Sequence, residues 1–225
     1  MSIAFGNHNY VFQASTADII IPAPTGIVDD DILVAVMGNS SSAAGSYTPP
    51  DVSWTNLSTT SGGYDGSYRY ASIFWKRASS ESGDYTFTTS SQMDWGIIQI
   101  VKGCISTGSP IDVYTNTLYN TLDTIIRAVG ITPTTTAGLL WVGMSWDRAI
   151  TKPSEFTQLD YQSGNYNYVN WAYKLNQSPV ATGNVDGSLS TESVSKHAMM
   201  LALKPAGPPV LSAAQVGSDI VVSWT

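Results

Sequence analysis

The feature of this sequence that most constrains its fold is a pair of segments that occurs twice. In the first copy, an apolar run at residues 31–38 (DILVAVMG) is followed by residues 49–57 (PPDVSWTNL). About one hundred residues later, residues 138–144 (GLLWVGM) repeat the run, and residues 152–159 (KPSEFTQL) again place an aromatic residue, Thr, an amide and Leu after a proline. We therefore predict that the chain is a duplication.

The residue pattern of the chain is typical of β-strands. Hydrophobic residues make up 43% of it and charged residues 12%, and the 12 Tyr and 7 Trp suit pleated sheets better than helices. Residues 84–88 (DYTFT) alternate polar and aromatic side chains, as a half-buried strand does. The run at residues 31–38 is apolar at successive positions, so we predict a central strand that is covered on both faces.

These strands predict an all-β fold for residues 1–204. The two similar halves, at about residues 9–104 and 111–204, each contain about five predicted strands with turn signals between them. Because so few strands close a core poorly, we expect both halves to build one jelly-roll-like β-sandwich of about ten interleaved strands. Residues 205–209 (PAGPP) predict a linker, and residues 210–225 predict two further short strands.

Charge and hydropathy exclude several classes of partner. The net charge is −7 and the Lys and Arg residues do not cluster, which argues against binding to nucleic acid or to an anionic membrane. No apolar run approaches the roughly 20 residues that span a bilayer, so we expect no membrane insertion. The first residues lack the basic and apolar regions of a signal peptide, which predicts synthesis in the cytoplasm.

The residues that catalysis or metal binding would need are sparse. We expect Cys104 to be a small buried residue, and His8 and His197 to be structural, since no serine lies in a nucleophile motif. No transition-metal spacing occurs, and no pair of carboxylates suggests glycoside hydrolysis. We predict no catalytic residue, no metal and no cofactor, although the acidic residues 29–31, read as a solvated turn, leave calcium open.

Tyrosines beside amide and hydroxyl residues are the candidates for binding. Such rings can stack on sugars or cover a protein interface, while the neighbouring amides bond hydroxyl groups. The candidate binding residues are Tyr64, Tyr68, Tyr161, Tyr166 and Tyr168.

Several motifs in fixed order carry a family resemblance. They are DILVA at 31–35, PPDVSWTNL at 49–57, FWKRA at 74–78, SGDYTF at 82–87 and WGIIQIVKG at 95–103. In this order they resemble jelly-roll-type domains of tailed-bacteriophage virion proteins, which occur as head decorations and in tail-tip or tail-fibre proteins.

The end of the chain resembles a different domain. Residues 208–225 resemble the first two strands of a fibronectin type III domain, which often follows such virion domains. A complete domain needs about 100 residues. We therefore expect the sequence to be a fragment; the alternative is that another chain completes the hairpin.

The resemblance implies a non-enzymatic virion structural protein, made in the host cytoplasm and displayed on the particle surface. It would serve capsid decoration or tail-mediated host adhesion, with other virion proteins, further copies of itself and a host-surface glycan as partners. One alternative is a carbohydrate-binding module of a larger secreted protein, against which the missing signal peptide counts. Another is a small depolymerase, which would require a carboxylate pair.

Overall fold

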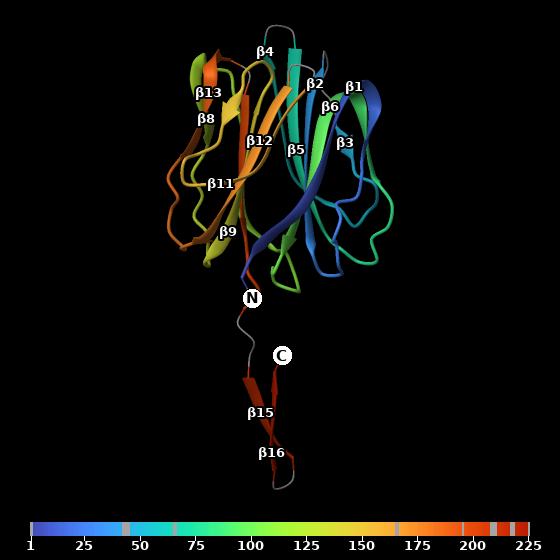
Figure 1. Ribbon diagram of the computed structural model, residues 1–225, viewed down its shortest axis with the longest axis vertical. Helices are drawn as coiled ribbons and strands as arrows, with labels where there is room; N and C mark the ends of the chain where they lie inside the picture. The colour runs from blue at the N-terminus through green and yellow to red at the C-terminus, as the bar shows by residue number, and fades with distance from the viewer. Residues whose placement is uncertain are drawn as a thin grey trace.

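The chain is an all-β protein. The computed structural model describes residues 2–41, 46–64, 67–164, 167–194, 196–207, 211–216 and 219–224. These residues form 16 strands in four antiparallel sheets (Figure 1). Within this described part of the chain, no helix is long and apolar enough to cross a membrane.

The first half consists of six strands in two layers. They are β1 (Ala4–Ile21), β2 (Ile32–Ser41), β3 (Tyr47–Thr48), β4 (Thr55–Tyr64), β5 (Ser67–Arg77) and β6 (Tyr85–Lys102). The larger layer has the order β1-β6-β2-β5-β4. β1 and β6 are long strands of 18 residues whose register shifts between Phe12 and Asp18. Past this irregularity they continue as a pair, residues 18–21 with 85–88, and β3 joins them to form the smaller layer.

The second half repeats this arrangement with eight strands. They are β7 (Ile111–Tyr119), β8 (Asp123–Ala128), β9 (Ala137–Ser145), β10 (Ile150–Thr151), β11 (Thr157–Gly164), β12 (Asn167–Gln177), β13 (Val185–Ser193) and β14 (Lys196–Leu203). The larger sheet has the order β11-β12-β9-β14-β7 and the smaller one the order β10-β13-β8. The topology matches the first half when β7 and β8 together stand for β1, and β13 and β14 together stand for β6.

Each half encloses a core between its two layers. The first-half core includes Ile19, Ile21, Leu33, Ala35, Met37, Trp54, Tyr70, Phe74, Tyr85, Phe87, Ile98 and Ile100. The second-half core includes Ile126, Ala128, Leu139, Trp141, Ile150, Phe156, Ala172, Leu189, Ala198, Met200 and Ala202.

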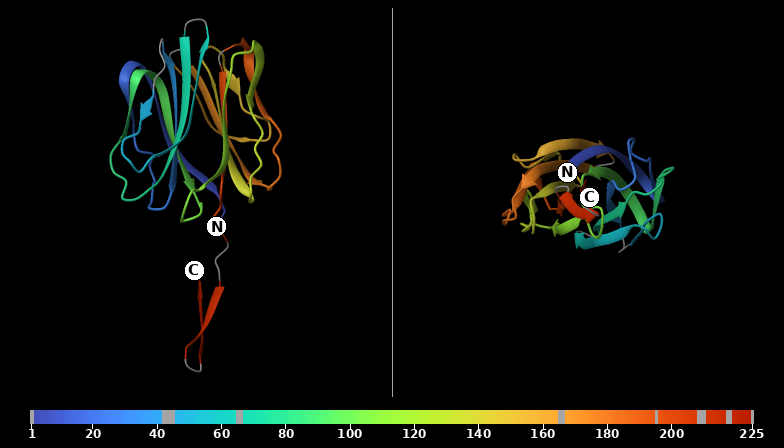
Figure 2. Two further views of the ribbon diagram at one scale, coloured as in Figure 1. Left: turned by 180° about the vertical axis from the view of Figure 1, so that it is seen from behind. Right: turned by 90° about the horizontal axis from the view of Figure 1, so that it is seen from below.

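A third core joins the two halves through their larger sheets. This inter-half core includes Ile32, Val34, Val36, Ala71, Ile73, Trp95, Ile97, Val101, Leu140, Val142, Met144, Trp171, Met199, Leu201 and Leu203. The chain is thus two sandwich-like halves packed back to back, as the two colour ranges show in the view from below (Figure 2).

The prediction of one sandwich of about ten strands was therefore wrong in its strand number and in how the core closes. Each half closes a core of its own on one face of its central strand, because β1 and β6 serve both layers in the first half and β10, β13 and β8 form a second layer in the second half; the other face is covered by the opposite half. The prediction for residues 31–38 is confirmed: β2 lies between β6 and β5, with alternate side chains facing the first-half core and the inter-half core.

The two halves are related by an approximate two-fold axis. Phe12 and Leu118 are equivalent, because Phe12 pairs with Trp95 of β6 and Leu118 pairs with His197 at the same position of β14. Gly62 packs against Leu118, and the equivalent Gly164 packs against Phe12. β4 therefore meets β7 as β11 meets β1, which is the self-complementary contact of a symmetric dimer within one chain.

In one pair of opposed core residues, the positions of the large and the small side chain are exchanged between the two halves. Ala35 of β2 lies opposite Phe74 of β5, whereas in the second half Trp141 of β9 lies opposite Ala172 of β12. All four side chains are fully buried. The large side chain is thus on β5 in one half and on the strand equivalent to β2 in the other.

The predicted strands near the end of the chain are present as β15 (Leu211–Val216) and β16 (Asp219–Trp224). They pair antiparallel in a separate two-stranded sheet. Their likeness to a fibronectin type III domain stays a prediction.

Candidate functional site

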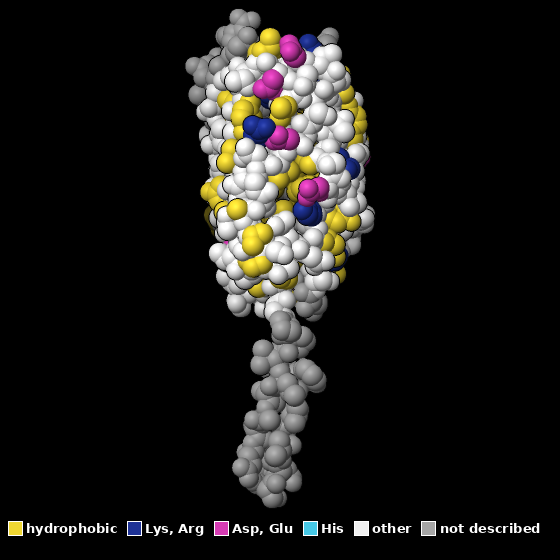
Figure 3. Space-filling view, turned by 90° about the vertical axis from the view of Figure 1, so that its left-hand side faces the viewer, with side chains coloured by type: hydrophobic (Ala, Val, Ile, Leu, Met, Phe, Trp, Pro, Cys, Tyr) yellow, Lys and Arg dark blue, Asp and Glu magenta, His cyan; other side chains and the backbone are white. Residues whose placement is uncertain are grey.

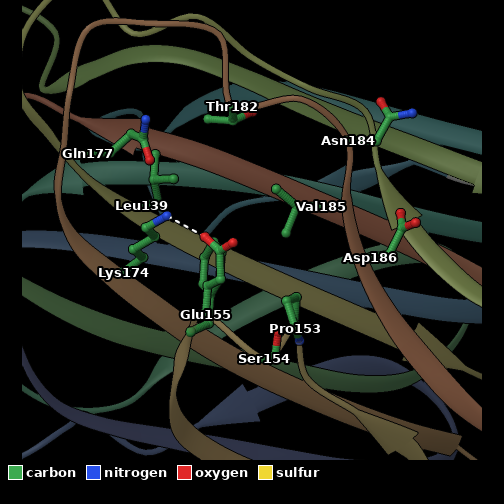
Figure 4. Close-up of a pocket in the computed structure, with 11 residues that line it drawn as sticks. Leu139, Pro153, Ser154, Glu155, Lys174, Gln177, Thr182, Asn184, Val185 and Asp186 are labelled. Carbon is green, nitrogen blue, oxygen red and sulfur yellow. Dashed lines mark hydrogen bonds and ion pairs between the residues drawn. The ribbon is translucent and has the colours of Figure 1, made fainter.

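A pocket in the second half is the best candidate site. It is a cavity of about 170 Å³, here called the second-half pocket (Figure 4). Its walls come from β9, from the end of β12, from the start of β13 and from the connections that precede β11 and β13. These segments lie far apart in the sequence and meet where the larger sheet and the smaller sheet of the second half come together.

The floor of the pocket is apolar. It is formed by Leu139 of β9, by Phe156, which directly precedes β11, and by Val185 of β13. Phe156 is held by a turn in which its N–H donates to the carbonyl of Pro153 at 3.1 Å, so its ring enters the second-half core. The floor therefore belongs to the rigid core of this half.

The rim of the pocket carries ion pairs. Lys174 Nζ donates to Glu155 Oε2 at 2.6 Å, and this hydrogen bond, with the lysine charge, holds the pKa of Glu155 below its usual range. Asp186 accepts from Nε and Nη2 of Arg127 at 2.7 and 2.6 Å. Because Glu155 stays ionised, it is suited to accept hydrogen bonds and unsuited to act as a general acid.

Neutral polar groups complete the rim. Asn184 accepts a hydrogen bond from the N–H of Gly130 at 3.2 Å through its carbonyl oxygen. Thr182 accepts from the N–H of Ile131 at 3.0 Å. These contacts fix the connection between β12 and β13, so the pocket has an ordered wall of amide and hydroxyl groups.

A face of the molecule seen in Figure 3 shows the same pairing of charges on a larger scale. Most basic side chains there lie beside an acidic one, with uncharged surface between the pairs. This face therefore lacks a patch of a single sign that would attract a strongly charged partner.

A wider hollow of about 410 Å³ is lined by residues near the start of the chain and by Pro205 and Ala206. None of the residues that line it is charged. Because it offers no charged group to orient a ligand, we assign this hollow no role.

The predicted binding tyrosines lie elsewhere. Tyr168 pairs with Ser163, which shares a face of β11 with Tyr161, so these two tyrosines are diagonal neighbours. Burial, and then the neighbouring Tyr168, raise the pKa of Tyr161. Lys174 of the pocket is six residues further along β12 than Tyr168, which is about 20 Å at the rise of a strand.

The remaining candidate tyrosines are not placed as side chains. Tyr64 pairs with Ser67, and Tyr68 pairs with Gly63 at the end of the β4–β5 hairpin, but the side chains of Tyr64 and Tyr68 lie outside the described part. Tyr166 lies outside the described residues altogether. The structure therefore brings together two of the five predicted residues, and neither lines the pocket.

The histidines and the cysteine have structural surroundings. His8 bonds Asp160 at 3.1 Å between β1 and β11, and its ring lies perpendicular to that of Trp171 with 4.9 Å between centroids. His197 is fully buried in β14, and burial lowers its pKa to about 3. Cys104 is buried as predicted, and burial raises its pKa to about 12.

The acidic residues 29–31 are engaged by separate partners. Asp31 accepts from Lys102 Nζ at 2.6 Å and from the N–H of Val28 at 3.0 Å. Asp29 accepts from the N–H of Ser80 at 2.7 Å. Across the described ranges, no group of three or more His, Cys, Asp or Glu side chains could hold a metal ion.

Sequence reasoning missed the second-half pocket. The signal that could have found it is the repeat itself, which sets Lys174 against Lys76. Comparisons with protein-family models, with curated proteins and with solved structures find no match for this chain.

Proposed function

We propose that this chain is a non-enzymatic structural protein of a tailed-bacteriophage particle, displayed on its surface for capsid decoration or tail-mediated host adhesion. The observation that carries the proposal is that the motifs of the virion resemblance build the framework of the first half. Residues 31–35 lead into and form the central strand β2, and Trp54 packs in the first-half core. Lys102, in the last motif, binds Asp31, in the first. Because these motif residues build the core and tie strands together, the resemblance supports an architectural function.

The strand content of each half supports the jelly-roll part of the proposal. Jelly rolls have eight strands in two sheets and occur in viral capsid proteins. The second half has eight strands, β7 to β14. The first half reaches the same number when β1 and β6, which contribute to both layers, are each counted twice. One jelly roll per half is thus the arrangement that we propose.

The partners that we propose are other virion proteins and further copies of this chain. A host-surface glycan is an additional partner if the copies sit on the tail. We propose no cofactor, no nucleic-acid partner and no membrane insertion, in keeping with the net charge of −7 and the scattered basic residues.

Cryo-electron microscopy of purified particles tests the proposal. We expect density with the outline of two sandwich-like halves at repeated positions. Positions on the icosahedral shell would identify a decoration protein, and positions on the tail would identify an adhesin. Particles that contain no copy of the chain, by mass spectrometry as well as in the density, would refute the virion assignment.

The second-half pocket favours one alternative, a carbohydrate-binding module of a larger secreted protein. Its rim of carboxylate, amide and hydroxyl groups is chemistry that bonds sugar hydroxyls. Recovery of the chain within a longer polypeptide from culture medium, and its absence from particles, would support this alternative.

A further inference from the structure

The second-half pocket has an equivalent position in the first half, which makes the two directly comparable. Lys76 lies opposite Leu33 as Lys174 lies opposite Leu139. Tyr85 is the counterpart of Val185. Tyr85 pairs with Ile21 of β1, Val185 pairs with Ala128 of β8, and β8 corresponds to this end of β1. Trp54 is the counterpart of Phe156 in the repeated segment.

In the first half this position is filled by side chains of the protein itself. Tyr85 and Trp54 are buried there with their rings edge to face, at 5.6 Å between centroids. Lys76 Nζ bonds Glu81 at 2.8 Å, and Tyr85 Oη donates to the same carboxylate at 2.8 Å. A ring, a hydroxyl group and a carboxylate thus occupy the site beside the lysine.

The Glu81 carboxylate is stabilised in its ionised form at this site. Burial opposes ionisation, but the hydrogen bonds from Lys76, the N–H of Ser79 and Tyr85, together with the lysine charge, outweigh it and lower the pKa of Glu81. The space beside Lys76 therefore favours an occupant with polar, hydrogen-bonding atoms.

In the second half the corresponding filling is missing. Val185 replaces the ring and hydroxyl group of Tyr85, and Phe156 replaces the larger Trp54. Glu155 reaches Lys174 from the rim, where its side chain is 71% exposed, whereas the side chain of Glu81 is only 8% exposed. The cavity of about 170 Å³ lies where the first half holds a phenol ring and a buried carboxylate.

The size of this space fits one six-membered ring. An apolar cavity of about 150 Å³ in another protein holds benzene. The apolar floor suits the C–H face of such a ring, and the rim offers acceptors on Glu155 and Asp186 and a donor on Lys174 (Figure 4). Glu155 is paired with Lys174 and Asp186 with Arg127, so the rim carries no net charge that would attract an ionic ligand. A neutral ring that carries several hydroxyl groups matches all of these features.

We propose that the second-half pocket binds one pyranose unit of a neutral glycan. This deepens the adhesion branch of the proposed function and rests on it for its biological role, although binding itself can be measured on the isolated chain. Because a single hexose is small, its Kd is expected on the order of 1 mM.

The test uses the full chain with the methyl glycosides of glucose, galactose, mannose and N-acetylglucosamine. Saturation-transfer NMR should detect at least one of them, and titration should give its Kd. Val185→Tyr puts the residue of the first half into the pocket and should weaken binding at least about tenfold. Val129→Tyr is the matched control, since Val129 is exposed in the same half and does not line the pocket, and it should leave the Kd unchanged.

A second variant guards against a folding defect. Glu155→Gln changes an exposed rim carboxylate, so the fold should persist while the Kd rises about fivefold or more. No binding of any glycoside at concentrations well above the expected Kd would overturn the proposal, and so would binding that Val185→Tyr and Glu155→Gln leave intact. Particles that carry a chain unable to bind sugars would refute only the pocket, whereas a sugar-binding chain absent from particles would refute only the virion assignment.

Discussion

Exchanging one core pair between the halves gives a direct test of their equivalence. Trp141 and Ala172 lie opposite each other on β9 and β12 and are fully buried. At the equivalent place the first half has Ala35 opposite Phe74. The double variant Trp141→Ala/Ala172→Phe therefore gives the second half the size order of the first.

The single variants set the scale. Trp141→Ala leaves a large cavity in the second-half core, and we expect it to lower the free energy of unfolding by about 3–5 kcal/mol. Its indole N–H has no hydrogen-bond partner among the described residues, so no hydrogen bond is lost with it. Ala172→Phe alone forces a ring against the indole and should cost about 1–3 kcal/mol.

The double variant should cost less than the sum of the two singles. The two Cβ atoms of a directly opposed pair are about 5 Å apart, so the new phenyl ring can enter the space that the indole leaves. We expect a coupling of about 1–3 kcal/mol. Ala172→Phe should thus lower stability clearly in the unchanged protein and have an effect near zero in the Trp141→Ala background.

Urea unfolding followed by far-ultraviolet circular dichroism measures these differences without relying on the tryptophan that is removed. Ala71→Phe is a control, since Ala71 is equally buried but lies in the inter-half core, and its effect should add to that of Trp141→Ala. If Ala172→Phe is equally destabilising in both backgrounds, the register that equates the two pairs is wrong.

Three further outcomes are expected. Trp54→Ala should cost about 3–5 kcal/mol, because Trp54 packs edge to face on aromatic neighbours in the first-half core; a thermal midpoint that does not move would contradict this. Gly38→Ala should cost about 1–3 kcal/mol by urea unfolding, since its Cβ would collide with the indole of Trp95, whereas Gly207→Ala meets open space and should be neutral. Asp123→Asn should cost about 2 kcal/mol, because it leaves the fully buried Lys196 without its carboxylate partner, although Asp123 itself is partly exposed. Burial opposes ionisation of Asp123, but hydrogen bonds from Lys196 and the N–H of Ile125 hold its pKa low. The difference in free energy of unfolding between wild type and Asp123→Asn should therefore be full above about pH 4 and shrink as the pH falls below it. A difference that does not change with pH would refute this.

The sequence predicted those parts of the fold that depend on local pattern. The apolar run at residues 31–38 required cover on both faces, and β2 has it. An apolar residue pattern does not reveal which element covers each face of the strand. Val34, for example, would be apolar whichever of the two cores it faced. The prediction of interleaved halves is wrong because the passage of β1 and β6 from one layer to the other leaves no periodic signal in the sequence.

The candidate site was harder to predict for a different reason. The second-half pocket is made by segments that meet only in the folded chain, and its defining feature is the smaller side chain of Val185 where the other half has Tyr85. Tyr64, Tyr68, Tyr161 and Tyr168, the placed residues among the predicted binding tyrosines, lie instead on the β4–β5 and β11–β12 hairpins. Residue-by-residue alignment of the halves around Lys76 and Lys174 was the available signal, because it sets Val185 against Tyr85.

The distribution of differences between the halves indicates where function can diverge. The inter-half core takes the same strands from both halves, so a change of size there disturbs both at once. Val36 and Val142 are identical in this core, whereas the residues opposite them, Ile73 and Trp171, differ in size and must be accommodated jointly by both halves. In the outer cores each half repacks independently, as the inverted pair formed by Trp141 and Ala172 demonstrates. Trp95 and His197, at equivalent positions of β6 and β14, differ as well. A duplicated sandwich can therefore keep one outer core filled for stability and open the other for a ligand, which is the difference between Tyr85 and Val185.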